Sequence, residues 1–263
     1  MNLKVTRRQT AGSRKPEPVA SSCSHFMRLC PLAAGALLAA LAGTGCGHLP
    51  RDPEHTLERV MQQKRLRVGL VENPPWVMHG EDGPRGAEIT MVRRFAESLG
   101  AAPEWFWGSE GVHMKALRDF ALDLVIGGID SSTPWAKTIG MTRPYFTERI
   151  VVAVPAGVAP PDSLKGQHVS VLGSEVAFAS LEKKGATPIL AATGQPQVSG
   201  PVAAPDWQLR QLGVTPTKFE LLTLKHVLLV PPGENGWLKR LQEFLASQAA
   251  EVPVLLRQNG GAR

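Results

Sequence analysis

Short apolar runs of strand length alternate with amphipathic stretches along most of the chain. The runs are rich in Val, Ile and Leu and end at turn residues, so they predict strands at 65–71, 122–128, 150–155, 168–173, 200–205 and 225–231. Stretches with helical periodicity predict helices at 88–100, 113–121, 174–185, 206–213 and 234–249. This alternation is typical of an α/β fold with mainly parallel sheets.

Two of the predicted helices have clear apolar faces. In 88–100 this face holds Ile89, Val92, Phe95 and Leu99, and Gly100 is the expected C-terminal stop. In 234–249 it holds Trp237, Leu241, Phe244 and Leu245. Residues 186–200 contain two prolines and poor periodicity, so the pattern leaves a loop and a degraded helix as alternatives there.

The composition predicts a folded chain without a nucleic-acid-binding surface. Of the 263 residues, 43% are hydrophobic and 20% are charged, which is ordinary for a globular protein. The net charge of +6 is concentrated at the N-terminus, because residues 1–45 hold six basic residues and one acidic residue. Residues 46–263 therefore keep 23 basic and 22 acidic residues, too balanced for a surface that follows a phosphate backbone.

The N-terminus predicts export from the cytoplasm. Arg28 precedes the apolar run "LCPLAAGALLAALAGTG" at 29–45, which is short for a membrane span and resembles a signal sequence. Met27 is an alternative start. Cleavage after Ala42 would give a secreted protein, whereas cleavage before Cys46 would give a lipoprotein with a tether at 46–56. We expect the second, with lipid on Cys46 and a periplasmic location, although Gly43 departs from the usual lipoprotein motif.

The usual signatures of catalysis are absent from the sequence. It contains no G-x-S-x-G, no glycine-rich phosphate loop ending in Lys-Ser/Thr, no H-E-x-x-H and no C-x-x-C. The histidines after residue 46 are scattered singly, which is typical of surface or core histidines. We therefore expect no metal and no cofactor.

Polar and aromatic residues follow three of the predicted strands. Ligands collect at the carboxyl ends of parallel strands, where loops are free. The first loop places Asn73 and Trp76 at the rim, and Asp206 follows the strand at 200–205. The third, "GGIDSST", supplies backbone N–H groups and hydroxyls, with the candidate residues Gly128, Asp130, Ser131, Ser132 and Thr133.

Each candidate also has a purely structural interpretation. Trp76 can pack on the sheet edge. Ser132 or Thr133 can cap a helix that begins at Pro134, because proline is favoured in the first turn. Asp206 fits the N-cap of the following helix.

Several segments resemble bacterial extracellular solute-binding proteins of family 3, the periplasmic receptors of ABC importers for polar amino acids. They are "LRVGLVENPPW", "GPRGAEITMVRRFAESLG", "LDLVIGGIDSSTPWAKTIGMTRPYF", "SLKGQHVSVLGSE", "APDWQL" and "VLLVPPGENGWLKRLQEFL". The resemblance spans about 65–250. It implies the two-lobed fold of type II periplasmic binding proteins, with lobe 1 at 57–150 plus 230–263 and lobe 2 at 151–229. The lobes would be joined by strands crossing at 147–154 and 226–232.

The chain departs from this family at one ligand-binding position. Receptors of the family carry an arginine after T-P-x that clamps the α-carboxylate of an amino acid. Here Trp135 and Ala136 stand where Glu-Arg is expected, and Lys137 comes one residue late. The standard grip on an α-amino acid is therefore not expected, but Asp206 matches the acid that binds the amino group, which leaves a cationic or amine-bearing ligand open. Lobe 2 is also expected to be shortened around 186–200.

The resemblance implies a monomeric binding protein that delivers a small polar solute to an ABC permease. Trp76 and Trp135 would form apolar walls of the site. Hydrogen bonds to the ligand would be donated by Ser131, Thr133 and Ser174. Asp206 would pair with a positive charge on the ligand. Two alternatives remain open. One is a periplasmic dehydratase-like enzyme with Glu72 or Glu175 as the acid, disfavoured by the missing arginine. The other is a ligand-sensing or degenerate envelope protein that docks to a partner.

Overall fold

The computed structural model divides the chain into two units, Met1–His48 and Leu49–Arg263. It describes residues 52–172, 175–191 and 198–260, all of which lie in the second unit. Cys46 and Ser174 lie outside these residues. Among the described helices, none has the length and apolar character needed to cross a bilayer.

The first sheet has five strands in the order β2-β1-β3-β10-β4. Their bounds are β1 Arg65–Leu70, β2 Ala102–Trp107, β3 Leu124–Ile126, β4 Gly140–Met141 and β10 Leu229–Val230. β1 pairs in parallel with β2 and β3, whereas β10 runs antiparallel to β3 and β4. The burial of all three residues of β3 agrees with the continuous apolar run in its sequence.

The second sheet has the order β7-β6-β8-β5-β9. Its strands are β5 Phe146–Pro155, β6 His168–Val171, β7 Thr187–Leu190, β8 Val202–Pro205 and β9 Val214–His226. β6 is parallel to β7 and β8, but β5 is antiparallel to β8 and β9. Both sheets are therefore mixed rather than mainly parallel.

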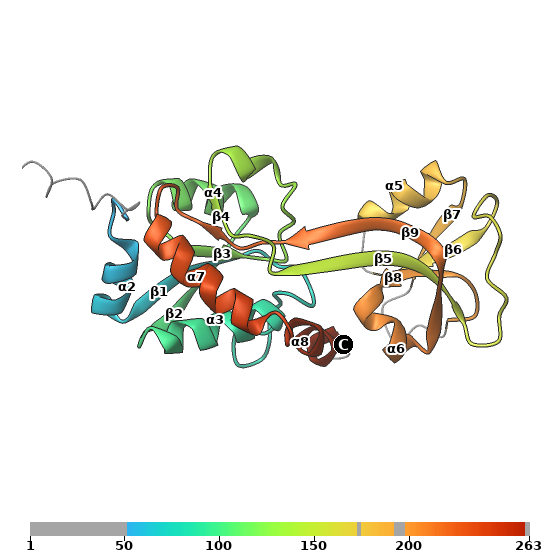
Figure 1. Cartoon of the computed structure of the whole chain (residues 1–263), viewed down its shortest axis with the longest axis horizontal. Helices are drawn as coiled ribbons and strands as arrows, with labels where there is room; N and C mark the ends of the chain where they lie inside the picture. Colours follow the sequence, from blue (N-terminus) through green and yellow to red (C-terminus); the bar gives the residue numbers. More distant parts are fainter. Residues whose placement is uncertain (1–51, 173–174, 192–197, 261–263) are drawn as a thin grey trace, which may run out of the picture. The chain divides into compact units, whose positions relative to one another are not determined.

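The two longest strands of the second sheet, β5 and β9, run antiparallel side by side and extend from this sheet to the part of the chain that holds the first (Figure 1). The expected second crossing at 226–232 differs from this, because the strand ends at His226 and only Leu229–Val230 pair in the first sheet. β9 was missed over most of its length because its residues alternate between partly buried and exposed, which gives no apolar run.

The helices cover the sheets, and most of the larger ones were predicted. They are α2 Thr56–Gln63, α3 Ala87–Ser98, α4 Glu110–Arg118, η1 Pro134–Lys137, α5 Glu175–Lys183, η2 Asp206–Gln208, α6 Leu209–Leu212, α7 Asn235–Gln248 and α8 Val252–Gly260. The predicted faces of α3 and α7 are confirmed. On α3, Ile89, Val92 and Phe95 are buried, as is the C-cap residue Leu99. On α7, Trp237, Leu241 and Leu245 are buried, and Phe244 packs against the same core.

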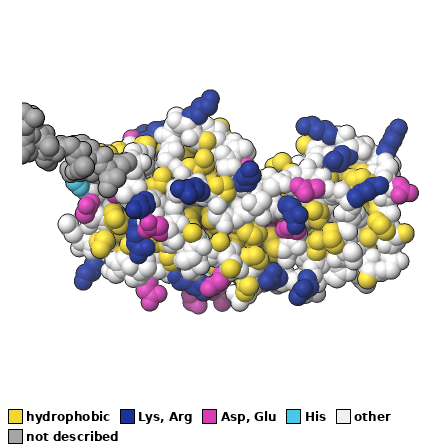
Figure 2. Space-filling view, in the orientation of Figure 1, with side chains coloured by type: hydrophobic (Ala, Val, Ile, Leu, Met, Phe, Trp, Pro, Cys, Tyr) yellow, Lys and Arg dark blue, Asp and Glu magenta, His cyan; other side chains and the backbone are white. Residues whose placement is uncertain are grey.

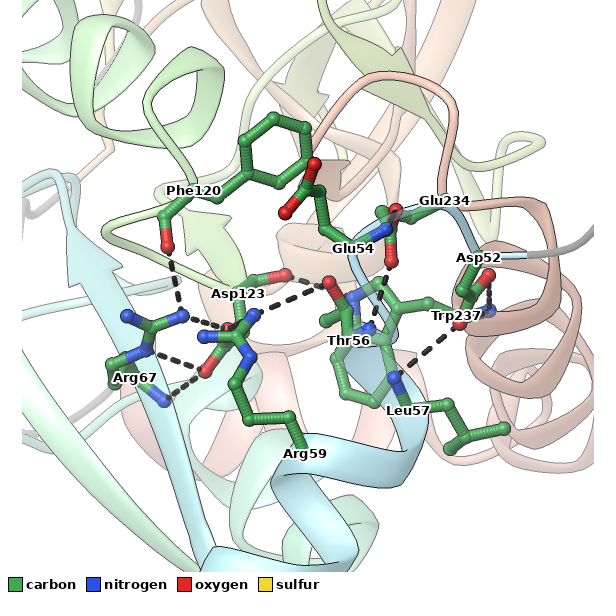
Figure 3. A network of polar contacts seen from close by, with 10 residues as sticks. All are labelled: Asp52, Glu54, Thr56, Leu57, Arg59, Arg67, Phe120, Asp123, Glu234 and Trp237. Carbon is green, nitrogen blue, oxygen red and sulfur yellow. Dashed lines mark hydrogen bonds and ion pairs between the residues drawn. The ribbon is translucent and has the colours of Figure 1, made fainter.

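Residues 52–56, expected to belong to a tether, pack onto the start of α7 (Figure 3). The Asp52 carboxylate accepts hydrogen bonds from Trp237 N at 2.9 and 3.0 Å. In return, Glu234 accepts from Glu54 N and Thr56 N, each at 2.9 Å. These carboxylates satisfy backbone N–H groups at the beginnings of α7 and α2, which would otherwise lack partners.

A second part of the same network fixes α2 and β1 to the start of β3 (Figure 3). The buried Asp123 carboxylate accepts from Arg67 Nε at 3.1 Å and Nη2 at 2.6 Å, and from Arg59 Nη2 at 3.0 Å. Trp237 donates its indole N–H to Asp123 O at 2.8 Å. The α2–β1 segment, the start of β3 and α7, which are far apart in sequence, are thereby joined around one buried acid.

Candidate ligand-binding site

A cavity of about 420 Å³ opens at the carboxyl ends of β1 and β3. We call it pocket 1; its lining residues are Val71, Glu72, Asn73, Glu110, Gly127, Gly128, Ile129, Asp130, Ser132, Thr133 and Pro134. Five of the candidate residues, Asn73, Gly128, Asp130, Ser132 and Thr133, therefore lie on one cavity. They come together because the two strands are neighbours in the sheet and end at the same edge.

Asp130 fixes the shape of the loop that follows β3. Its Oδ1 accepts from Ser132 N at 2.8 Å and Ser132 Oγ at 2.5 Å, and its Oδ2 accepts from Lys225 N at 2.5 Å. Ser131 N donates to Lys225 O at 2.8 Å, so this loop is attached to the end of β9. Partial burial acts to raise the pKa of Asp130, but these hydrogen bonds lower it overall, and the side chain is an anion at neutral pH.

The carboxylate of Glu88 accepts hydrogen bonds from backbone N–H groups that we expected to face a ligand. From α3, its fully buried Oε2 accepts from Gly127 N at 2.7 Å and Gly128 N at 2.9 Å. Its Oε1 accepts from the Tyr145 hydroxyl at 2.5 Å. The expectation that these two glycine N–H groups face a ligand is therefore wrong. Burial raises the pKa of Glu88 in spite of these bonds, and burial together with Glu88 raises the pKa of Tyr145 well above its usual value.

Trp76 lies beneath the pocket rather than at its rim. It is 3% exposed and packs against His226, with ring centroids 4.1 Å apart and the ring planes tilted by 32°. Gly128, at φ 63°, packs against it so closely that a Cβ there would lie 2.5 Å from Trp76 Cδ1. Of the two interpretations of Trp76, the structure agrees with packing and not with a wall of the ligand site. Position 128 requires glycine, because a side chain would collide with Trp76 and because φ is positive there.

His226 continues this buried contact toward the second sheet. It bonds Gly128 O at 3.0 Å through Nδ1 and Glu148 Oε2 at 3.2 Å through Nε2. Glu148 in turn accepts from Trp207 Nε1 at 2.6 Å. The end of β9 is thus anchored on both sides, by hydrogen bonds to the partly buried Gly128 and to the buried Glu148.

The polar groups that remain at pocket 1 are mostly acceptors. Asn73 donates to Gly127 O at 2.9 Å, and Glu110 accepts from Thr133 Oγ1 at 3.1 Å. The carboxylates of Glu72, Glu110 and Asp130 line the cavity, and no lysine or arginine is among its lining residues. A pocket with this charge favours a cationic or amine-bearing molecule. Among the described residues, these acids do not form a group that could hold a metal ion.

Two predicted caps and one predicted wall differ in the structure. Pro134 begins η1 as expected, but Thr133 makes no side-chain cap and bonds to Glu110 instead. Asp206 begins η2 behind Pro205 and likewise makes no cap hydrogen bond. Trp135 is outside the lining of pocket 1; it packs on apolar neighbours of α4, with the Arg118 guanidinium 5.8 Å from its ring.

Asp206 belongs to a second cavity, also of about 420 Å³, which we call pocket 2. There its Oδ2 accepts from Arg149 Nε at 3.0 Å. The structure therefore separates Asp206 from the predicted residues of pocket 1. Sequence reasoning missed Glu88, Glu110, Arg149 and His226, because each lies inside a helix or strand and gave no signal of its own in a loop.

Relatives of known name match part of the chain. Membrane-bound lytic murein transglycosylase F of Vibrio cholerae is 28% identical over 129 residues, which is 49% of this chain and 24% of that protein. The same-named protein of Mannheimia succiniciproducens is 27% identical over 130 residues, 48% of this chain and 27% of the relative. The chain thus spans about a quarter of the length of these relatives.

Solved structures match the fold over a larger share of the chain. An ancestral cationic amino acid solute-binding protein covers 78% of this chain and 99% of its own, with a TM-score of 0.61 and 17% identity. The L-cystine solute receptor of Neisseria gonorrhoeae, unliganded and open, covers 78% and 97%, with a TM-score of 0.59 and 17% identity. These likenesses show the fold, two α/β lobes of the type II periplasmic binding proteins.

The family model for bacterial extracellular solute-binding proteins, family 3, matches residues 66–252. The match includes both sheets and the loops of pockets 1 and 2. The chain belongs to this family of solute-binding proteins.

Proposed function

We propose that this protein binds a small, amine-bearing polar solute in pocket 1, outside the cytoplasm, and delivers it as a monomer to an ABC-type importer. The observation that carries the proposal is the charge of the pocket, whose lining includes three acidic residues and no lysine or arginine. The predicted lobes, 57–150 with 230–263 and 151–229, remain part of this proposal.

The donors of an ammonium group match the carboxylate acceptors of pocket 1. An ammonium group carries up to three N–H donors, and Glu72, Glu110 and Asp130 offer carboxylate oxygens to accept them. Asp130 keeps its charge at neutral pH because backbone and hydroxyl donors hold it. Closure about β5 and β9 would then remove the ligand from water and strengthen these interactions.

We expect 1,4-diaminobutane and 1,5-diaminopentane to stabilise the purified full chain in a thermal-shift experiment, and succinate to have no effect. Ligand at 100-fold its dissociation constant adds about 2.7 kcal/mol of stability. Glu72→Gln and Glu110→Gln should each weaken diamine binding by about tenfold, since a hydrogen bond to a charged group is worth about 1.5–3 kcal/mol.

Glu81→Gln is the matched control, because Glu81 is exposed and outside the lining of pocket 1. Stabilisation by succinate but not by diamines contradicts the proposal. So does diamine binding that is equally strong in the wild type and in both pocket variants.

We also propose that lipid on Cys46 holds the protein at the periplasmic face of the membrane. Cys46→Ser should move the protein from the membrane fraction to the soluble periplasmic fraction, because the thiol that carries the lipid is lost. The measurement is fractionation followed by immunoblotting, with the unsubstituted protein alongside. Membrane association that is unchanged in Cys46→Ser contradicts a lipid anchor.

A binding role is preferred to a catalytic one. The dehydratase-like alternative needs an acid beside an arginine that holds a carboxylate. Glu72 has no arginine among the residues that line pocket 1 with it, and the side chain of Glu175 lies outside the described residues. The partial match to murein transglycosylases motivates a second test, in which purified murein is incubated with the protein and the release of soluble fragments is measured. We expect none.

A further inference from the structure

The side chain of Trp207 reaches from the second lobe into the apolar core of the first. Trp207 follows β8 of the second sheet, yet it is buried in the apolar cluster that contains the buried side chains of α3, α7 and α8. Its indole Nε1 donates to Glu148 Oε1 on β5 at 2.6 Å. The two lobes are therefore joined by a side-chain contact as well as by the strands β5 and β9.

The helix α8 forms the other side of this contact. It packs against both α3 and η2. An added Cβ on Gly260 would lie 3.1 Å from Trp207 Cη2, so the indole rests directly against the end of the helix. Gln211 of α6 donates from Nε2 to Arg257 O at 3.0 Å. We call the contact of Trp207 and Gln211 with α8 the α8 contact.

The α8 contact and pocket 1 lie on opposite sides of the sheets. Along β3, Leu124 belongs to the cluster that includes α8, and the next residue, Val125, belongs to the cluster that includes α4. Along β5, Ile150 packs with α5 and Val151 with α6. Because consecutive residues of a strand point to opposite faces, α4 and α8 cover opposite faces of one sheet, as α5 and α6 do of the other.

The view in Figure 1 shows which of these helices share a side. The helices α6 and α8 lie below β5 and β9, whereas α4 and α5 lie above them. Pocket 1 includes Glu110, the first residue of α4, and Ile129 of the cluster that α4 covers. The pocket therefore lies on the side of α4 and α5, away from the α8 contact.

A rotation about β5 and β9 moves elements on the two sides of these strands in opposite senses. Bringing α5 toward α4 over pocket 1 thus draws η2 away from α8 and takes Trp207 out of the cluster that buries it. Exposing a buried indole is unfavourable, because its large apolar surface enters water. The α8 contact therefore opposes closure over pocket 1.

We propose that the α8 contact is a latch that holds the lobes apart on the side of pocket 1 and thereby sets the affinity of this pocket. The inference rests on the proposed function, since it takes pocket 1 as the site over which the lobes close. When only a fraction of the protein has the closed, binding-competent arrangement, the apparent affinity is reduced by that fraction. A weaker latch increases the fraction and tightens binding, although Gln211 and Gly260 lie outside the lining of pocket 1.

Gly260→Leu acts on the latch from α8. Its side chain needs space that the Trp207 ring fills, so we expect it to displace the indole. Gln211→Ala acts from α6 by removing the hydrogen bond to Arg257 O, and it leaves the core intact because Gln211 is exposed. In calorimetric titration of the purified full chain with 1,4-diaminobutane, the dissociation constant should fall at least about fivefold in Gly260→Leu and by less in Gln211→Ala.

Two variants are the matched controls. Gly200→Leu adds the same side chain at a position where an added Cβ meets no atom within 4 Å. Trp237→Phe removes an indole hydrogen bond from the same apolar cluster without touching the α8 contact. Both should bind the diamine as the wild type does. A merely structural role of the α8 contact predicts unchanged or weaker binding in Gly260→Leu, whereas the latch predicts tighter binding.

The arrangement of the lobes can be measured without any ligand. Val112 on α4 and Val176 on α5 are 63% and 62% exposed, so Val112→Cys and Val176→Cys can carry spin labels once the three native cysteines are changed to serine. Double electron–electron resonance then gives the distance between the two helices. We expect Gly260→Leu to shift this distance to shorter values than in the wild type and in Gly200→Leu.

The proposal is overturned if the wild type, Gly260→Leu and Gln211→Ala have the same distance distribution. It is also overturned if the wild type binds the diamine and Gly260→Leu binds it no more tightly than Gly200→Leu. A shortened distance in Gly260→Leu with no diamine binding in any of the proteins supports the latch and contradicts the function proposed for pocket 1. Failure of the latch and failure of the proposed function are thus distinguished.

Discussion

Trp237→Ala should destabilise the protein by about 3–5 kcal/mol, the usual cost of removing a large aromatic side chain from a packed core. Trp237 is fully buried in the largest apolar cluster, with its ring centroid 5.3 Å from that of Phe95. Its indole also donates to Asp123 O at 2.8 Å, and truncation leaves that carbonyl without this donor. Equilibrium unfolding in urea measures the loss.

Trp107→Ala is the matched control for this prediction. Trp107 is 37% exposed at the end of an edge strand and stacks on His79. Its truncation should cost less than about 1 kcal/mol, because the side chain lies at the surface and its removal leaves no enclosed cavity. If both variants lose the same stability, the central position assigned to Trp237 is wrong.

Glu88→Ala should cost about 3 kcal/mol or more, because it leaves three donors without an acceptor. The N–H groups of Gly127 and Gly128 and the hydroxyl of Tyr145 all donate to this carboxylate. Each buried donor left unsatisfied costs about 1–3 kcal/mol, less whatever water recovers. Because Gly127 and Gly128 line pocket 1, the variant should also weaken diamine binding.

Glu97→Ala provides the reference on the same helix, since Glu97 is exposed on α3. It should change the free energy of unfolding by no more than about 0.5 kcal/mol. A Glu88→Ala protein as stable as Glu97→Ala would show that the loop after β3 does not depend on the buried carboxylate.

Stability should fall as pH rises through the titration of Glu88. Burial raises the pKa of Glu88 in the folded state above its usual value of 4.5. Between that value and the folded pKa the native state binds more protons than the unfolded state, so the unfolding free energy decreases with rising pH. The contribution is complete below 4.5 and lost above the folded pKa.

Glu88→Gln removes this titration while keeping the shape of the side chain. The difference in unfolding free energy between wild type and Glu88→Gln should therefore shift against the wild type as pH rises from 4.5, measured by urea unfolding at a series of pH values. His226 and Tyr145, the other titratable groups near Glu88, are present in both proteins. Parallel pH profiles for the two proteins contradict the raised pKa.

The core and its helices could be predicted from the sequence because the regular spacing of apolar residues marks the buried face of each element. Apolar residues recur with helical spacing in 88–100 and 234–249, and both faces are buried as expected. The apolar run at 122–128 similarly marked β3. Most of β9 could not be predicted, since a strand whose residues alternate between partly buried and exposed lacks an apolar run.

The polar contacts of the two pockets were decided by the tertiary structure. The sequence placed Asn73 and Asp130 at strand ends, and the shared edge of β1 and β3 brought them to one cavity. Nothing in the sequence indicated that Glu88 would accept hydrogen bonds from the N–H groups of Gly127 and Gly128, in the loop that follows β3.

The sequence by itself determined the family, the alternation of elements and the apolar faces, because these depend on residue type and spacing along the chain. The tertiary structure alone decided that Arg149 meets Asp206, 57 residues later, and that Trp76 packs under Gly128. A charged or aromatic side chain can serve several partners, and the packing of distant strands selects which partner it has.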